Sequence, residues 1–193
     1  GSDGDHGIWG VVGAPANASE EHQKALRSTM VGFLDRLLIV PEPFLAAMGL
    51  RDDPVFQENG ESDPTKHSLI VDVGGGTTDL CLVRGYYPTA DDQVSVAKAG
   101  NWIDDMFALA LQRRYPDLKL TRVSITQLKE NHSFVDGYER DASVKVYVDG
   151  RPRTVDFTEI ISEACGALVP VILEGIKELL ARCDSDSVEP VMK

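Results

Sequence analysis

The residues with the clearest chemical meaning form a short glycine-rich turn between two apolar segments. It consists of Gly74, Gly75, Gly76, Thr77 and Thr78. Glycines let a backbone take left-handed angles and let a ligand approach closely. Successive exposed N–H groups at such a turn make a concave site for an anion, typically phosphate, and the two threonines add hydroxyl donors. The turn therefore predicts a phosphate-binding site.

Two acids flank this turn, Asp72 before it and Asp79 after it. A carboxylate beside phosphates would repel them unless a cation lay between, so Asp72 predicts a Mg²⁺ ion held directly or through water. The alternative is a glycine-rich hairpin that binds nothing. The complete sequence Asp72–Asp79 favours phosphate binding, because each glycine has a mechanical use in a phosphate-binding turn. It is neither a Walker loop nor a dinucleotide fingerprint, because no Gly-Lys-Ser/Thr is present and a strand follows the glycines.

The segments around the turn predict strands. Leu69–Val73 reads as a buried strand broken by one acid, and Leu80–Val83 reads as a second one. Upstream, residues 8–12 and 38–40 predict strands on either side of a helix capped by Asn17 or Ser19. We expect its apolar face to hold Leu26, Met30, Phe33, Leu34 and Leu37. A strand-helix-strand unit implies parallel pairing and an α/β layer structure.

Glu42 follows the second of these strands and precedes a helix that Pro43 can begin. Sites in α/β proteins are often built where a strand ends and a helix starts. An acid is also favourable at a helix start for purely structural reasons. Spacing alone leaves both interpretations open.

The rest of the chain predicts further α/β structure. We expect a strand over residues 93–98, a helix over 102–114 capped by Asn101, and a helix over 121–131. Alternating residues on either side of Asp149-Gly150 predict a hairpin. Thr158 should cap one long last helix, which Pro170 would kink. Arg51–His67 is acidic and poor in apolar residues, which is typical of a loop between domains.

Composition excludes some partners. The formal net charge of −12 disfavours nucleic acid and anionic membranes, because like charges repel at long range. No apolar run is long enough to span a bilayer and no signal peptide is evident, so we expect no membrane insertion. The three cysteines, Cys81, Cys165 and Cys183, are widely spaced and fit free thiols in a reducing cytoplasm.

Several motifs together resemble the actin-like ATPases, a superfamily of actin, heat-shock chaperones, sugar kinases and bacterial filament proteins. Asp72–Asp79 resembles their second phosphate loop, and Glu42-Pro43 with Ala46-Ala47 resembles the motif whose acid or amide orients the attacking water. Lys98–Asp104 is similar to a turn near the nucleotide. Gln127–Glu130 is similar to a helix with a Lys-Glu pair around adenosine.

The chain is also similar to the bacterial actins that organise magnetosome chains. The segments that carry this resemblance are Val40–Phe44, Asp79–Leu82, Asp91–Gln93, Lys98–Gly100 and Val148–Arg153. It implies self-association into cytoplasmic filaments and magnetosome-associated proteins as partners.

The resemblance implies a ribonuclease-H-like actin ATPase fold, with a mixed sheet, flanking helices, and ATP or ADP with Mg²⁺ bound between two domains. Residues 1–50 would be the tail of domain I, 51–67 a linker, and 68–193 domain II with a subdomain inserted at about 116–157.

Site roles also follow from the resemblance. Glu42 and Asp72 would be catalytic, and Asp72 would orient the metal. The nucleotide contacts would be Gly74, Gly75, Gly76, Thr77, Thr78, Gly100, Asp104, Lys129 and Glu130.

Two family landmarks are absent: a first phosphate loop near the N terminus and an adenosine motif after the last helix. We therefore expect an excised middle of a longer protein, with Gly1-Ser2 as a cloning remnant. Such a piece should be inactive alone, whereas the whole protein would hydrolyse ATP to control polymerisation. The alternatives are a chaperone-like or sugar-kinase-like ATPase domain and an interaction module that needs no nucleotide.

Overall fold

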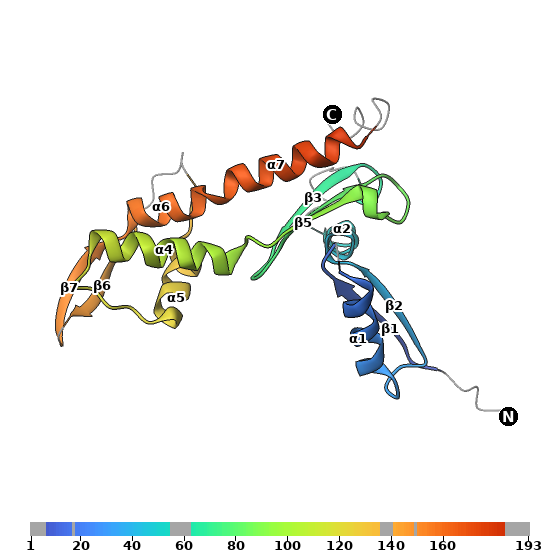
Figure 1. The fold of residues 1–193 in the computed structure, drawn as a ribbon, viewed down its shortest axis with the longest axis horizontal. Helices are drawn as coiled ribbons and strands as arrows, with labels where there is room; N and C mark the ends of the chain where they lie inside the picture. Colours follow the sequence, from blue (N-terminus) through green and yellow to red (C-terminus); the bar gives the residue numbers. More distant parts are fainter. Residues whose placement is uncertain (1–6, 17, 55–62, 136–140, 149, 184–193) are drawn as a thin grey trace. The chain divides into compact units, whose positions relative to one another are not determined.

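The computed structural model describes residues 7–16, 18–54, 63–135, 141–148 and 150–183 (Figure 1). The described elements, in chain order, are β1 (Trp9–Ala14), α1 (Glu20–Met30), β2 (Arg36–Pro41), α2 (Glu42–Arg51), β3 (Ser68–Val73), β4 (Thr78–Val83), the 3₁₀ helix η1 (Ala90–Asp92), β5 (Gln93–Val96), α4 (Gly100–Arg114), α5 (Arg122–His132), β6 (Ser143–Val148), β7 (Arg151–Asp156), α6 (Thr158–Gly166) and α7 (Leu168–Ala181).

The chain divides into two compact units. The first contains the described residues up to Asp72, then Thr78–Val96, and those from Gly175 onward. The second contains Val73–Thr77 and Ala97–Glu174.

In the first unit, β1 and β2 pair in parallel, and α1 connects them along the chain, as the sequence predicted. Ser19 caps α1, since its hydroxyl accepts the His22 N–H at 3.3 Å, while Asn17 lies outside the described residues. The helix ends at Met30, before Gly32 takes a φ of +90°. The prediction that Phe33, Leu34 and Leu37 continue its apolar face was therefore wrong.

The three-stranded sheet of the first unit has the order β3-β4-β5. A connection as short as Gly74–Thr77 makes β3 and β4 a hairpin, since parallel strands need a crossover of about a dozen residues. All six residues of β4 are buried. Its alternate side chains face two helices: Cys81 and Val83 pack with Ala47 of α2, and Leu80 lies against Gly175 of α7.

The predicted burial of β3 was wrong for two of its residues, since Val71 and Val73 are 36% and 43% exposed. Leu38 of β2 is 56% exposed as well. β3 lies at the edge of its sheet and β2 belongs to a sheet of two strands, so each has a neighbour on one side only. The buried residues of β2 are Val40 and Pro41, at its end.

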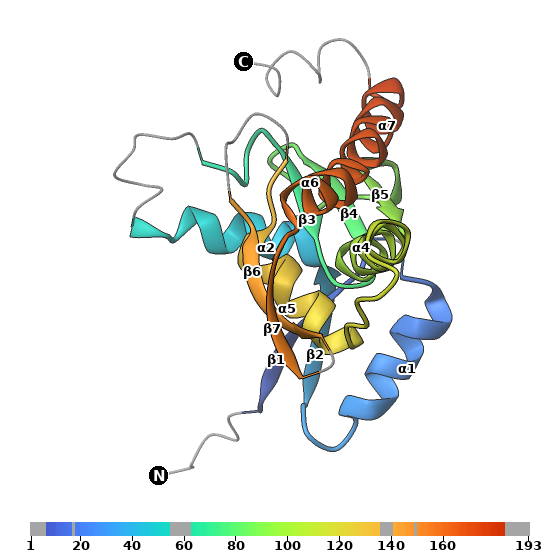
Figure 2. The same ribbon diagram turned by 90° about the vertical axis from the view of Figure 1, so that its left-hand side faces the viewer.

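The second unit packs α4, α5 and α6 with the antiparallel β6–β7 hairpin around one apolar core. Helices α4 and α6 lie side by side in both views (Figures 1 and 2). The Phe157 ring is fully buried and meets the rings of Phe107 and Tyr115 edge-on, with centroids 6.0 and 6.3 Å away. Gly150 has a φ of +76°, as suits the predicted turn, whereas Asp149 lies outside the described residues.

Two local predictions in this unit were wrong, and a third was confirmed in part. The predicted last helix is interrupted at Ala167 and so forms two helices, and the break lies within one turn before Pro170, which has no N–H to donate to the Gly166 carbonyl. Thr158 does not cap α6, because it is the first helical residue and its hydroxyl accepts the Ala142 N–H at 2.9 Å. Asn101 does not cap α4, which begins at Gly100 after Ala99 without a side-chain cap.

In the part of the chain that the structure describes, no helix has the length and apolar character needed to cross a membrane.

Candidate nucleotide-phosphate site

The turn Gly74–Thr77, called here the phosphate turn, is fixed by backbone hydrogen bonds. The Gly74 N–H donates to the Thr77 carbonyl at 2.9 Å. The carbonyls of Gly74 and Gly75 accept the N–H groups of Gly100 and Asn101 at 3.0 and 2.8 Å. These two donors begin α4, so the turn satisfies helix-start N–H groups that no side chain caps.

With the carbonyls of Gly74, Gly75 and Thr77 occupied, the phosphate turn presents donors. Gly74, Gly75 and Gly76 are exposed, and no backbone acceptor for the Gly75 or Gly76 N–H occurs among the described residues. The space above them is open, because a Cβ on Gly76 would meet nothing within 4 Å and one on Gly75 only Asn101 Nδ2 at 3.9 Å. Two adjacent outward N–H groups with free space above them can bind an anion.

The expected left-handed angles were wrong for this turn. The described glycines with positive φ are Gly32, Gly85 and Gly150, and none of them lies in the phosphate turn. The glycines there leave room for a close approach rather than permitting an unusual φ.

A buried ion pair holds the start of α4. Lys129 Nζ lies 2.8 Å from Asp104 Oδ1 and donates to the Gly100 carbonyl at 3.2 Å. The Thr126 hydroxyl donates to Asp104 Oδ2 at 2.7 Å, so both oxygens of a carboxylate that is 2% exposed have partners. Gly100 leaves space for this contact, since a Cβ there would lie 3.3 Å from Lys129 Nζ. Helix α5 is thereby tied to the residues that hold the phosphate turn.

The remaining predicted contacts lie in different surroundings. Thr77 is half-buried in the phosphate turn, whereas Thr78 is fully buried in β4, paired with Val96 of β5. Glu130 is exposed on α5. The contacts of Thr78 and Glu130 with a nucleotide stay predictions.

Two carboxylates of the first unit, Asp79 and Asp72, act on a third, that of Glu42, and the three are called here the acid group. Glu42 is the first residue of α2 and is half-buried. Burial raises the pKa of Glu42, and the charges of Asp79 and then Asp72 raise it further. Asp79 is 1% exposed and accepts the Ala16 N–H at 3.0 Å, which links β4 to the turn that follows β1.

Gly13 of β1 belongs to this site and was missed by the sequence analysis. A Cβ there would lie 2.9 Å from Cγ of Glu42 and 3.2 Å from Cδ1 of Leu45, so a side chain would displace Glu42. No local sequence pattern indicates this role for Gly13. Its use depends on a residue 29 positions away, since Glu42 packs across β1.

The donor chemistry of the acid group suits Mg²⁺, which prefers carboxylate oxygens and water. However, within residues 7–183 as far as they are described, no three carboxylate, histidine or cysteine side chains come close enough to hold a metal ion directly. Asp72 therefore fits a Mg²⁺ contact through water better than a cage of protein ligands.

Comparisons with known proteins show which family the chain belongs to. The family described as MreB/Mbl protein matches residues 8–193. Actin-like protein MamK of Magnetospirillum gryphiswaldense is 35% identical over 173 residues, which cover 90% of this chain and 45% of the relative.

Two solved structures are similar as well. A MamK double helical filament superposes with a TM-score of 0.84 at 34% identity, covering 96% of this chain and 53% of that one. A non-polymerising MamK mutant bound to AMPPNP superposes with a TM-score of 0.74 at 33% identity, covering 96% of this chain and 54% of the other.

The chain spans about half the length of the curated relatives it matches. The family match covers nearly all of it, and the resemblance to actin-like proteins predicted from the sequence is confirmed. The chain belongs to the MreB/Mbl family of actin-like proteins.

Proposed function

We propose that this chain supplies part of the ATP site of a filament-forming actin-like ATPase. The observation that carries the proposal is the pair of outward N–H groups on Gly75 and Gly76, fixed by hydrogen bonds to α4. A MamK relative that binds AMPPNP supports a nucleotide as the ligand. The structural likeness to a MamK filament supports self-association of the whole protein.

In this proposal the phosphate turn binds the terminal phosphates. Gly75 and Gly76 are the main donors, because the Gly74 N–H is already bonded to Thr77. Lys129 and Asp104 position the turn through Gly100 rather than contacting adenosine. Glu130, which is exposed, is the better candidate for the adenosine contact.

The acid group would act on water near the phosphates. Glu42 would orient or deprotonate the attacking water, and its raised pKa makes it a better proton acceptor. Asp72 would contact Mg²⁺ through water, and a bound Mg²⁺ would neutralise phosphate charge. That the acid group and the phosphate turn serve one nucleotide is inferred from the family resemblance, and Asp72 and Gly74 are only two positions apart in the sequence.

We further propose that the whole protein is a cytoplasmic filament that works with magnetosome-associated proteins, and that it binds neither nucleic acid nor membrane directly. The similarity to MamK supports the first part and the net charge of −12 supports the second. The filament proteins among its relatives favour this function over a chaperone-like or sugar-kinase-like one.

The phosphate turn can be tested in the 193-residue chain by ¹⁵N NMR titration with Mg-AMPPNP. Two hydrogen bonds to charged oxygens are worth about 3–6 kcal/mol. Since about 4.1 kcal/mol corresponds to 1 mM, we expect a dissociation constant near the millimolar range, with the largest shifts at Gly75 and Gly76. Gly75→Val should abolish these shifts, because the side chain fills the space above the turn.

Gly49→Val is the matched control, since a Cβ at Gly49 meets nothing within 4 Å and one at Gly75 meets only Asn101 Nδ2 at 3.9 Å. It should bind as the parent chain does. If Gly75→Val keeps the parental affinity, the phosphate turn is not the binding site.

The acid group predicts a pH-dependent change in stability. Because the folded-state pKa of Glu42 is raised above 4.5, its ionised form destabilises the fold at neutral pH. Glu42→Gln should therefore raise the free energy of unfolding at neutral pH, and this gain should vanish well below pH 4.5, where Glu42 is protonated in both states. Urea denaturation at both pH values measures it.

Glu20→Gln is the control, because Glu20 is also the first residue of a helix and is exposed. Removing that charge should slightly destabilise α1 at neutral pH. A Glu42→Gln variant that is no more stable than the parent at neutral pH would argue against a destabilising acid group.

Assembly needs a protein of the relatives' length. We suggest a hybrid in which this chain replaces the matched 173-residue segment of Magnetospirillum gryphiswaldense MamK. It should sediment with Mg-ATP and release phosphate. Glu42→Ala should still sediment but turn over about 10²–10⁴-fold more slowly, because it removes the water-positioning acid. Sedimentation that is indifferent to ATP, or an unchanged rate in Glu42→Ala, would contradict the proposal.

A further inference from the structure

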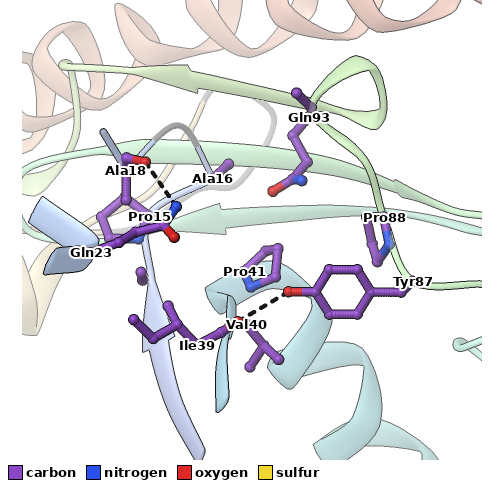
Figure 3. A pocket seen from close by; sticks show the side chains of 12 residues that line it. Pro15, Ala16, Ala18, Gln23, Ile39, Val40, Pro41, Tyr87, Pro88 and Gln93 are labelled. Atoms are coloured by element: carbon purple, nitrogen blue, oxygen red, sulfur yellow. Dashed lines mark hydrogen bonds between the residues drawn. The ribbon is translucent and has the colours of Figure 1, made fainter. Parts of the chain in front are cut away.

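The first unit contains a cavity of about 470 Å³ that takes no part in the proposed phosphate site (Figure 3). One wall is formed by the ends of β1 and β2 and the start of the connection to α1; the other is the loop between β4 and β5. The lining residues are Ala14, Pro15, Ala16, Ala18, Gln23, Ile39, Val40, Pro41, Tyr87, Pro88, Ala90 and Gln93.

Both walls are fixed by contacts across the cavity rim. The Tyr87 hydroxyl donates to the Ile39 carbonyl at 3.1 Å, and the Tyr87 ring meets the Phe44 ring edge-on at 5.6 Å between centroids. Figure 3 shows the ring of Tyr87 beside Pro41 at this rim. The cavity is therefore a preformed space of the kind that binds small molecules.

One buried polar atom in this cavity lacks a partner. Gln93 is 5% exposed, and its side chain points from β5 into the space (Figure 3). Its Nε2 donates to the Thr89 carbonyl at 2.8 Å, which fixes the orientation of the amide. Gln93 Oε1 then receives no hydrogen bond from any described residue. A buried acceptor without a hydrogen bond destabilises the fold, so a ligand that donates to it would be bound more tightly.

The cavity wall offers acceptors and few donors. None of its lining residues is charged, so it offers no cation to an anionic ligand. Pro15, Pro41 and Pro88 have no N–H. Gln23 uses its Nε2 on the Ala18 carbonyl at 3.1 Å, so it too leaves its oxygen rather than its amide hydrogens for a ligand.

We infer that this cavity binds a small, uncharged molecule with an apolar body and one N–H or O–H group that donates to Gln93 Oε1. Water alone fits less well, because a molecule of liquid water takes about 30 Å³ and needs two to four polar partners. Several waters here would lie against alanine, proline, valine and isoleucine side chains. A nucleotide fits less well, because its phosphates need several hydrogen-bond donors or a cation, and this wall offers few donors and no charged side chain.

Indole and benzofuran test this inference, because they share size and shape but only indole has an N–H donor. Each is titrated into the ¹⁵N-labelled 193-residue chain while the Gln93 side-chain amide signals are followed by NMR. We expect indole to bind about tenfold more tightly or better, since benzofuran leaves the buried oxygen without a donor. Equal affinities, or no binding of either compound, would overturn the assignment.

Two variants complete the test. Gln93→Leu keeps an apolar side chain of similar size and should remove the preference for indole, whereas a preference that persists would overturn the role of Gln93. Ala18→Leu should fill the cavity and lower the affinity for both compounds by about tenfold or more. The substitution keeps the backbone carbonyl of residue 18, which accepts the hydrogen bond from Gln23 Nε2. Parental affinity for both compounds in Ala18→Leu would place binding elsewhere.

Discussion

The candidate site depends on two backbone hydrogen bonds between the start of α4 and the phosphate turn. The N–H groups of Gly100 and Asn101 need acceptors because no side chain caps α4, and the carbonyls of Gly74 and Gly75 supply them. With those carbonyls occupied, the donors of the turn face outward. The buried Asp104–Lys129 pair fixes the first turn of the same helix.

The two groups of charged residues differ in how their charges are compensated. Asp104 is buried but has Lys129 and Thr126 as partners, which suits a residue that holds structure. The pKa of Glu42 is instead raised, first by burial and then by the charges of Asp79 and Asp72. A carboxylate whose pKa is raised in this way is more typical of a functional site than of a structural one. This contrast favours the acid group for chemistry and Lys129 for positioning.

Features set by a few neighbouring residues were predictable from the sequence. The glycine turn, the helix beginning at Glu42, the parallel β1–β2 pair and the β6–β7 hairpin all follow from local pattern and turn chemistry. Features set by distant contacts were not. Burial of β4 rather than β3 depends on which strand lies in the middle of the sheet. Asn101 lost its expected capping role because the phosphate turn supplies acceptors directly, and Gly13 is explained only by Glu42 packing across it.

Amide hydrogen exchange measured residue by residue tests the central claim most directly. In the free chain, the N–H groups of Gly100 and Asn101 should exchange slowly because they are hydrogen-bonded to the phosphate turn. The N–H groups of Gly75 and Gly76 should exchange fast, and should slow when Mg-AMPPNP is added. If Gly75 and Gly76 are already protected without nucleotide, or if Gly100 and Asn101 exchange as fast as unstructured amides, the phosphate turn is not held with its donors outward.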